Sequence, residues 1–283
     1  MRVFLFVAFL ISCSALPAMA GRDVPIAFLN FDGIYGSPNG DVLAAEGFTG
    51  TRVFRISPDG TTSVAADGLR GPIDVAEDLD GNLYVTNFND ATVSKITPSG
   101  EETTFATVLT NPSGIVRDST GDFYVSHYGD YDPITGFGLG DVVLKITADG
   151  EVSTFSEGGL LAAPVGIAVD AADTVYVGNF HDGKILKLGA DGTQTEIADL
   201  TGPEISFAIG HIEITNGRIY ATGLQSLELF RVNPKNGRVR TRDISSRARF
   251  PNGITVDPVT GKLFVARAFA PNGTLVRFNF GAY

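Results

Sequence analysis

Residues 72–87 read PIDVAEDLDGNLYVTN, and this stretch decides the fold. It holds two short runs, 72–76 and 83–87, rich in the β-branched and aromatic residues that favour strands. The intervening DLDG supplies the small and polar residues of a tight turn. A third such run at 93–96 and a turn ending at Gly100 follow, and 103–105 begins a fourth strand. The pattern predicts an antiparallel meander of four short strands.

The same unit occurs six times along the chain. Its copies follow one another at steps of about 40 to 50 residues, which is the length of a four-stranded propeller blade. The turn between the first two strands aligns at Gly40, Gly81, Gly121, Asp173, Gly217 and Gly261. The second strands align at 42–46, 83–87, 123–127, 175–179, 219–223 and 263–267. We therefore predict an all-β fold, a six-bladed β-propeller of four-stranded antiparallel blades.

The two ends of the repeat array indicate how the ring closes. The sixth copy has its third strand at 274–280, and the chain then ends at Tyr283 without a fourth. An apolar segment, 24–31, precedes the first copy and has no blade of its own. An open ring would leave two unpaired strand edges. We expect 24–31 to complete the last blade, which makes 21–283 a single domain.

The first twenty residues, MRVFLFVAFLISCSALPAMA, have the pattern of a secretory signal peptide. Arg2 precedes an apolar run too short to span a bilayer, and Ala18-Met19-Ala20 offers a cleavage site. We expect a secreted or periplasmic protein with no transmembrane segment. A lipid anchor at Cys13 is the alternative. Cleavage would remove the only cysteine, so the remaining chain could form no disulfide.

The net charge of the chain indicates which classes of partner it can bind. The chain carries 21 Lys and Arg against 32 Asp and Glu, a net charge of −11. Nucleic acid is therefore not an expected partner, because its phosphates attract basic surfaces. The acidic excess either keeps the protein soluble by self-repulsion or attracts a cation. The sequence leaves the oligomeric state open.

A recurring string inside the repeats resembles a known family. Pro-x-Gly-Ile-x-Val-Asp stands at 164–170 and again at 251–257, and Gly-x-Leu-Tyr-Val stands at 81–85. With the basic third strands, these strings resemble the NHL repeat. The resemblance covers residues 32 to 280 and implies a six-bladed disc.

Polar residues at the starts of the first strands are the first candidates for a site, because those starts meet at one mouth of the channel. We expect Asp32, Asp74 and Asn252 to offer oxygen ligands to Ca²⁺ or another divalent cation. His211 is the candidate general base, with Asp32 as a second catalytic residue. Alternatively, these side chains only bond to nearby backbone amides. The six positions are Asp32, Asp74, Ser113, Val165, His211 and Asn252.

The ends of the second strands lie at the same mouth. We expect five of these end residues to bind a ligand together with Asp74 of the first-strand set. The five are Glu46, Asn87, His127, Asn179 and Arg267. Glu46 and Arg267 would lie behind the first-strand cluster. An insertion at 128–141, YGDYDPITGFGLGD, connects the second and third strands of the third copy and would fold over the mouth.

A second resemblance concerns activity. Residues 250–254, FPNGI, resemble the Pro-Asn-Gly motif of the senescence-marker/gluconolactonase family of six-bladed lactonases. That resemblance implies that Asn252 is a metal ligand, although the other ligand positions of that family do not match this chain. Strictosidine-synthase-like propellers share the string. Amidating lyases hold zinc with three channel histidines, but His127, His181 and His211 do not occupy equivalent repeat positions here.

Two hypotheses for function follow. The first is a secreted or periplasmic propeller that binds a small molecule, a glycan or a protein at the channel mouth. The alternative is a metal-dependent, gluconolactonase-like hydrolase that uses the central channel. Another propeller enzyme, such as a lyase or a synthase, would also suit the pattern, because one fold hosts many functions.

Overall fold

The computed structural model describes residues 24–25, 31–134, 137–201, 209–246, 250–257, 260–267 and 274–278. The predicted signal peptide and Cys13 lie outside these residues. No helix in the described ranges is long and apolar enough to cross a membrane.

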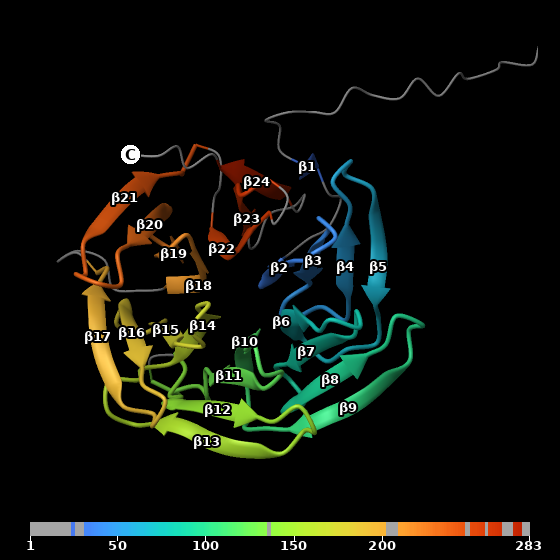
Figure 1. Cartoon of the computed structure of the whole chain (residues 1–283), viewed down its shortest axis with the longest axis horizontal. Coiled ribbons are helices and arrows are strands. Elements are labelled where there is room, and N and C mark those ends of the chain that lie inside the picture. The colour runs from blue at the N-terminus through green and yellow to red at the C-terminus, as the bar shows by residue number, and fades with distance from the viewer. Residues whose placement is uncertain are drawn as a thin grey trace, which may run out of the picture.

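Six four-stranded antiparallel sheets surround a central axis and form a disc (Figure 1). The predicted six-bladed propeller is confirmed. Blades 1 and 2 comprise β2 (Ile34–Gly36), β3 (Val42–Ala45), β4 (Val53–Ile56), β5 (Thr62–Ala66), β6 (Pro72–Glu77), β7 (Leu83–Asn87), β8 (Thr92–Ile96) and β9 (Glu102–Thr107). Blades 3 and 4 comprise β10 (Pro112–Arg117), β11 (Phe123–His127), β12 (Val142–Ile146), β13 (Val152–Glu157), β14 (Pro164–Val169), β15 (Val175–Asn179), β16 (Lys184–Leu188) and β17 (Gln194–Asp199).

Blade 5 comprises β18 (Ile209–Thr215), β19 (Arg218–Gly223), β20 (Glu228–Val232) and β21 (Val239–Asp243). Blade 6 comprises β22 (Pro251–Val256), β23 (Leu263–Arg267), β24 (Thr274–Phe278) and, as its outermost strand, β1 (Val24–Pro25). In the β1–β24 ladder, Val24 pairs with Leu275 and Pro25 with Thr274. The N-terminal segment therefore closes the ring as predicted, with Val24–Pro25 as the described part of the closing strand, and residues 26–30 lie outside the described residues.

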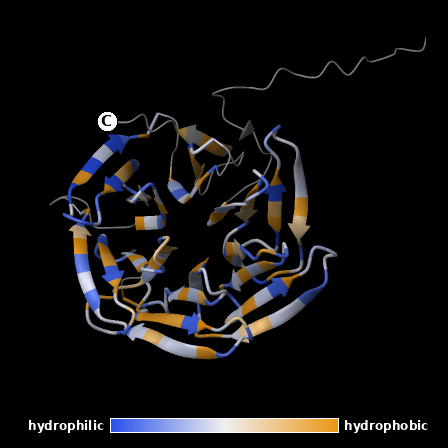
Figure 2. Cartoon of the chain, viewed as in Figure 1, coloured by the Kyte–Doolittle hydropathy of each residue, from blue (hydrophilic) through white to orange (hydrophobic). Residues whose placement is uncertain are grey.

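The core lies between neighbouring blades rather than in one central mass. Leu43 and Val53 of blade 1, for example, pack against Val75 and Val85 of blade 2, all fully or almost fully buried. Successive side chains of a strand point to opposite faces, so each strand contributes to two interfaces. The alternation of hydrophobic and hydrophilic residues is visible along the outer strands in Figure 2.

An irregularity at the start of the first strands shapes the channel. In β6, Pro72 pairs with Asn87 and Val75 with Val85, so the register shifts between them. The same shift occurs in β10, β14, β18 and β22. Such a bulge re-aims the residues inside it. It releases two residues from regular pairing in β6, β10, β18 and β22 and one residue, Val165, in β14, and those residues lie at the channel.

Candidate functional site at the channel mouth

One position inside the bulge is occupied by glycine in four blades. By the strand register, Asp74 of blade 2 and His211 of blade 5 stand where the other blades have Gly33, Gly114, Gly166 and Gly253. A Cβ on Gly33 would overlap the carboxylate of Asp74, and one on Gly253 would overlap the carbonyl oxygen of Asp32. The channel is too narrow here for six side chains, and the glycines leave room for two.

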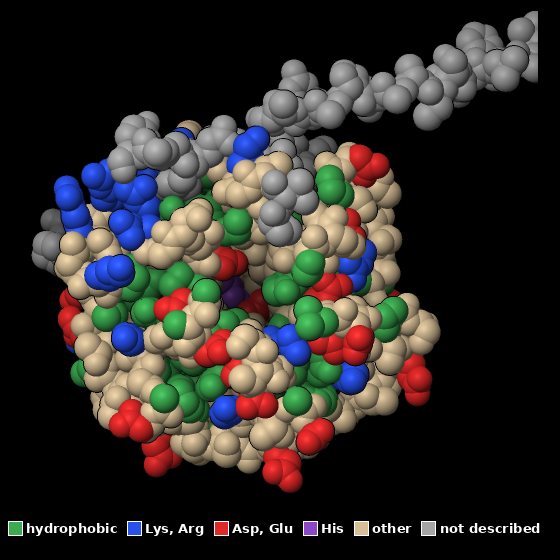
Figure 3. Space-filling model, in the orientation of Figure 1, with side chains coloured by type: hydrophobic (Ala, Val, Ile, Leu, Met, Phe, Trp, Pro, Cys, Tyr) green, Lys and Arg blue, Asp and Glu red, His purple; other side chains and the backbone are tan. Residues whose placement is uncertain are grey.

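Those two side chains meet across the channel, because blades 2 and 5 are opposite in a ring of six. His211 Nδ1 lies 3.5 Å from Asp74 Oδ2, and His211 Nε2 lies 3.1 Å from Asp32 Oδ1. Asn252 donates from Nδ2 to the same Asp32 oxygen at 2.8 Å. Histidine (purple) and acidic (red) atoms are visible at the bottom of the central hollow in Figure 3.

The structure thus brings together Asp32, Asp74, His211 and Asn252, four residues that the sequence analysis selected. These four residues occupy two neighbouring positions of the repeat. Asp74 and His211 occupy the glycine position itself, whereas Asp32 and Asn252 stand one residue earlier in their blades. The cluster is therefore two levels deep, with Asp32 and Asn252 nearer the mouth.

Electrostatics decide the protonation state of His211. Burial lowers the pKa of this imidazole, but the carboxylates of Asp74 and Asp32 outweigh burial and raise the pKa to about 10. His211 is therefore an imidazolium at neutral pH, with both ring nitrogens acting as donors. An imidazolium cannot accept a proton, so the arrangement does not support His211 as a general base.

The donor set does not fit the divalent cation that the lactonase resemblance implies. Asp74 accepts from the backbone N–H of Val75 at 2.9 Å and of Ile115 at 3.1 Å, so both its oxygens are engaged. Asn252 turns its amide N–H, not its oxygen, toward Asp32. Ca²⁺ requires six to eight oxygen ligands. The described residues contain no group of three or more His, Cys, Asp or Glu side chains arranged to hold a metal.

The second-strand ends take structural positions. Asn87 is 2% exposed and donates to Ser94 Oγ at 2.8 Å, and Asn179 is fully buried and donates to the Leu160 carbonyl at 2.7 Å. Glu46 forms an ion pair with Arg52 at 2.5 Å.

His127 and Arg267 complete this set of predicted ligand-binding residues. His127 is half-buried, and burial lowers its pKa. Arg267 pairs with Pro251 in the ladder of blade 6. The printed side-chain partners of Glu46, Asn87 and Asn179 lie outside the Asp32–His211 cluster. That Glu46 and Arg267 lie behind the cluster stays a prediction.

A hollow of about 160 Å³ opens directly above the cluster. Asp32, Asn252 and Ser113 contribute its polar lining. Its aromatic walls come from four successive blades and consist of Phe48, Phe88, Tyr128, Tyr131 and Phe180. We call this hollow the mouth pocket.

The aromatic walls are the part of the site that the sequence analysis missed. Phe88, Tyr128 and Phe180 each directly follow the last residue of a second strand, so the repeat places them equivalently. Tyr131 comes from the blade 3 insertion, and its ring lies 5.7 Å from that of Tyr128. The recurrence of an aromatic residue directly after the second strand would have predicted these walls from the sequence. The insertion reaches the mouth, as expected.

Comparison with known proteins agrees with this architecture. The family model described as the virginiamycin B lyase family matches residues 31–275. No curated protein matches the chain.

Among solved structures, a streptogramin B lyase is 17% identical with a TM-score of 0.64, covering 91% of this chain and 97% of that one. A gluconolactonase from Xanthomonas campestris is 14% identical with a TM-score of 0.73, covering 90% and 89%. A virginiamycin B lyase from Staphylococcus aureus, in a catalytically inactive histidine-to-alanine form with quinupristin, is 16% identical, has a TM-score of 0.64 and covers 86% and 80%. At these identities, the likeness shows a shared fold.

Proposed function

The chain belongs to the virginiamycin B lyase family, and from this premise we propose that it binds a small organic molecule in the mouth pocket. The observation that carries the proposal is the pocket itself, in which aromatic side chains surround a hollow with the Asp32 carboxylate at its floor. Ligand sites are typically concave and apolar, with a few polar groups that fix orientation. The mouth pocket has this composition.

The floor of the pocket specifies part of the ligand. Asp32 Oδ1 already accepts from Asn252 and lies within hydrogen-bond distance of His211. Asp32 Oδ2 receives no hydrogen bond from the described residues, and it remains available to a donor on the ligand. We therefore expect a molecule with an apolar or aromatic body that packs against the walls and a hydroxyl, amide or ammonium group that reaches Asp32.

A second candidate is a lyase that acts on the molecule bound here, which the family match favours. In that case Asp32 would accept a proton from the ligand, since His211 is already protonated. A metal-dependent lactonase has less support, because the cluster does not offer the oxygen ligands that a cation needs.

The test measures binding and turnover together. Isothermal titration with quinupristin and a panel of cyclic esters should give a complex, and Tyr131→Ala should weaken it about tenfold by removing one aromatic wall. Ile134→Ala is the matched control, because Ile134 lies in the same insertion, is 92% exposed and does not line the pocket. Equal affinity in wild type and Tyr131→Ala would contradict the proposal, and so would the absence of any complex.

Mass spectrometry of the recovered ligand separates the enzymatic alternatives. Elimination opens a cyclic ester without a change of mass, whereas hydrolysis adds one water. An unchanged ligand supports binding without catalysis. A ring-opened isomer of the same mass that is lost in Asp32→Asn supports the lyase.

A further inference from the structure

A second charged region lies on blade 5, away from the channel. In the ladders of this blade, Tyr220 pairs with Arg231 and Arg231 with Arg240. Arg242 stands two residues beyond Arg240 in β21 and therefore points to the same face, and Arg238 directly precedes this strand. Figure 3 shows Lys and Arg side chains gathered over the part of the disc where Figure 1 places β20 and β21.

This arrangement places two like charges, Arg231 and Arg240, directly opposite each other on neighbouring strands, a pairing that destabilises a sheet relative to opposite charges. In blade 1, by comparison, Arg55 forms ion pairs with Asp41 at 3.2 Å and with Glu77 at 3.0 Å. No acid in the described part of the chain forms an ion pair with Arg238 or Arg240, and both are exposed. Their concentration is notable in a chain of net charge −11.

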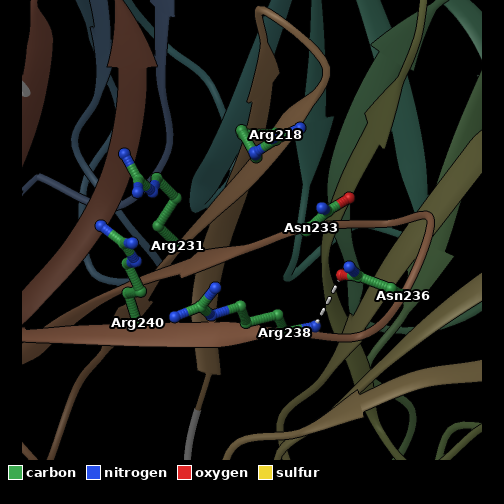
Figure 4. A pocket seen from close by; sticks show the side chains of 6 residues that line it. All are labelled: Arg218, Arg231, Asn233, Asn236, Arg238 and Arg240. Atoms are coloured by element: carbon green, nitrogen blue, oxygen red, sulfur yellow. Dashed lines mark hydrogen bonds between the residues drawn. The ribbon is translucent and has the colours of Figure 1, made fainter. Parts of the chain in front are cut away.

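The arginines border a defined hollow. It has a volume of about 150 Å³, and its described lining consists of Arg218, Arg231, Asn233, Asn236, Arg238 and Arg240. Figure 4 shows the guanidinium groups of Arg231, Arg238 and Arg240 on one side of the hollow. The backbone N–H of Arg238 donates to Asn236 Oδ1 at 3.2 Å, which fixes the turn that precedes β21. None of these described lining residues carries a carboxylate.

We propose that this hollow binds a small ligand carrying two or more phosphate or sulfate groups. A guanidinium presents its N–H donors in a planar fork that matches the oxygens of such groups. Successive arginines on one face of a strand are about 7 Å apart, so a single oxyanion cannot engage all of them. Its described lining includes no aromatic side chain on which nucleic-acid bases could stack, and the acidic remainder of the protein repels long polyanions. These features favour a compact ligand.

Isothermal titration with inorganic pyrophosphate at low ionic strength tests the proposal. The wild type should bind pyrophosphate more tightly than orthophosphate or sulfate, because only pyrophosphate can engage two arginines with separate groups. The double substitution Arg238→Gln/Arg240→Gln should weaken pyrophosphate binding about tenfold or more through lost charge-assisted hydrogen bonds. Added salt should weaken the wild-type complex.

Arg70→Gln is the control, because Arg70 is exposed and its side chain does not line the hollow. The double variant should unfold at the same or a higher temperature than the wild type, since it relieves repulsion. A weakened complex with an unchanged control supports the site. Three results would overturn it: no binding by the wild type, undiminished binding by the double variant, or an equal loss in Arg70→Gln.

Discussion

The contact between His211 and Asp74 across the channel leads to a quantitative prediction. The substitution Asp74→Asn preserves the shape of the side chain and an acceptor for the Ile115 N–H, and it removes one of the two charges that face the imidazolium. Raising the pKa of His211 from 6.5 to about 10 corresponds to roughly 5 kcal/mol of interaction that favours the charged form. Asp74 and Asp32 share this interaction.

We therefore expect Asp74→Asn to lower the free energy of unfolding by about 2 kcal/mol at neutral pH, or about 4 to 8 °C in Tm. Urea unfolding followed by circular dichroism measures the difference. Asp80→Asn in the same blade is the control, because Asp80 is an exposed turn residue and loses the same charge.

The pH dependence gives an independent check of the same reasoning. The folded pKa of His211 lies above its ordinary value of 6.5. The contribution of charged His211 to the stability of the fold is therefore fully present below about pH 6.5 and is lost as pH rises through about 10. The difference between wild type and Asp74→Asn should shrink over that interval. A difference below about 0.5 kcal/mol at neutral pH, or one that stays constant up to about pH 10.5, would refute a charged His211–Asp74 pair.

Three further substitutions test other parts of the structure by urea unfolding. Burial raises the pKa of Glu213 to about 7, so the wild type should lose stability as pH rises from 4.5 to that value. The variant Glu213→Gln should therefore be more stable than the wild type by about 1 kcal/mol above pH 7. Equal pH profiles of stability for the two proteins would contradict this. Gly253→Ala should destabilise by about 1 to 3 kcal/mol, because its Cβ would overlap the Asp32 carbonyl oxygen; an unaffected variant would show a wider channel. Asn87→Ala should lower the free energy of unfolding by about 1 to 3 kcal/mol through unsatisfied buried groups and leave ligand affinity unchanged. Weaker ligand binding by a fully folded variant would instead support the predicted role of Asn87 in binding the ligand.

The repeat register predicted most of the fold, because each blade carries its own strand and turn signals. The second strand predicted at 83–87, for example, coincides with β7 (Leu83–Asn87). The missing fourth strand of the sixth copy was enough to predict closure by β1. Both inferences depend only on local pattern and on counting strands.

The candidate site was only partly predictable, because its geometry arises from the ring. The sequence selected Asp32, Asp74, His211 and Asn252, but it gave no sign that Asp74 and His211 face each other across the axis. That contact favours the charged form of His211 and engages Asp74 Oδ2, one of the oxygens that were expected to hold a metal. The strand-end pattern did not predict the walls of the mouth pocket, because the wall residue Phe88 stands one place beyond the strand end Asn87.

The ladder between β1 and β24 also determines when the site can form during folding. Its strands are β1 (Val24–Pro25) and β24 (Thr274–Phe278), so the ladder cannot form before all six blades have been synthesised. Contacts of such long sequence separation form slowly, because loop-closure entropy is lost before they become favourable. Blades 1 to 5 are each built from consecutive strands and can assemble earlier. Asp32, beside blade 1, reaches Asn252 of blade 6 only when the ring closes, so an incomplete chain should be unable to bind a ligand at the mouth.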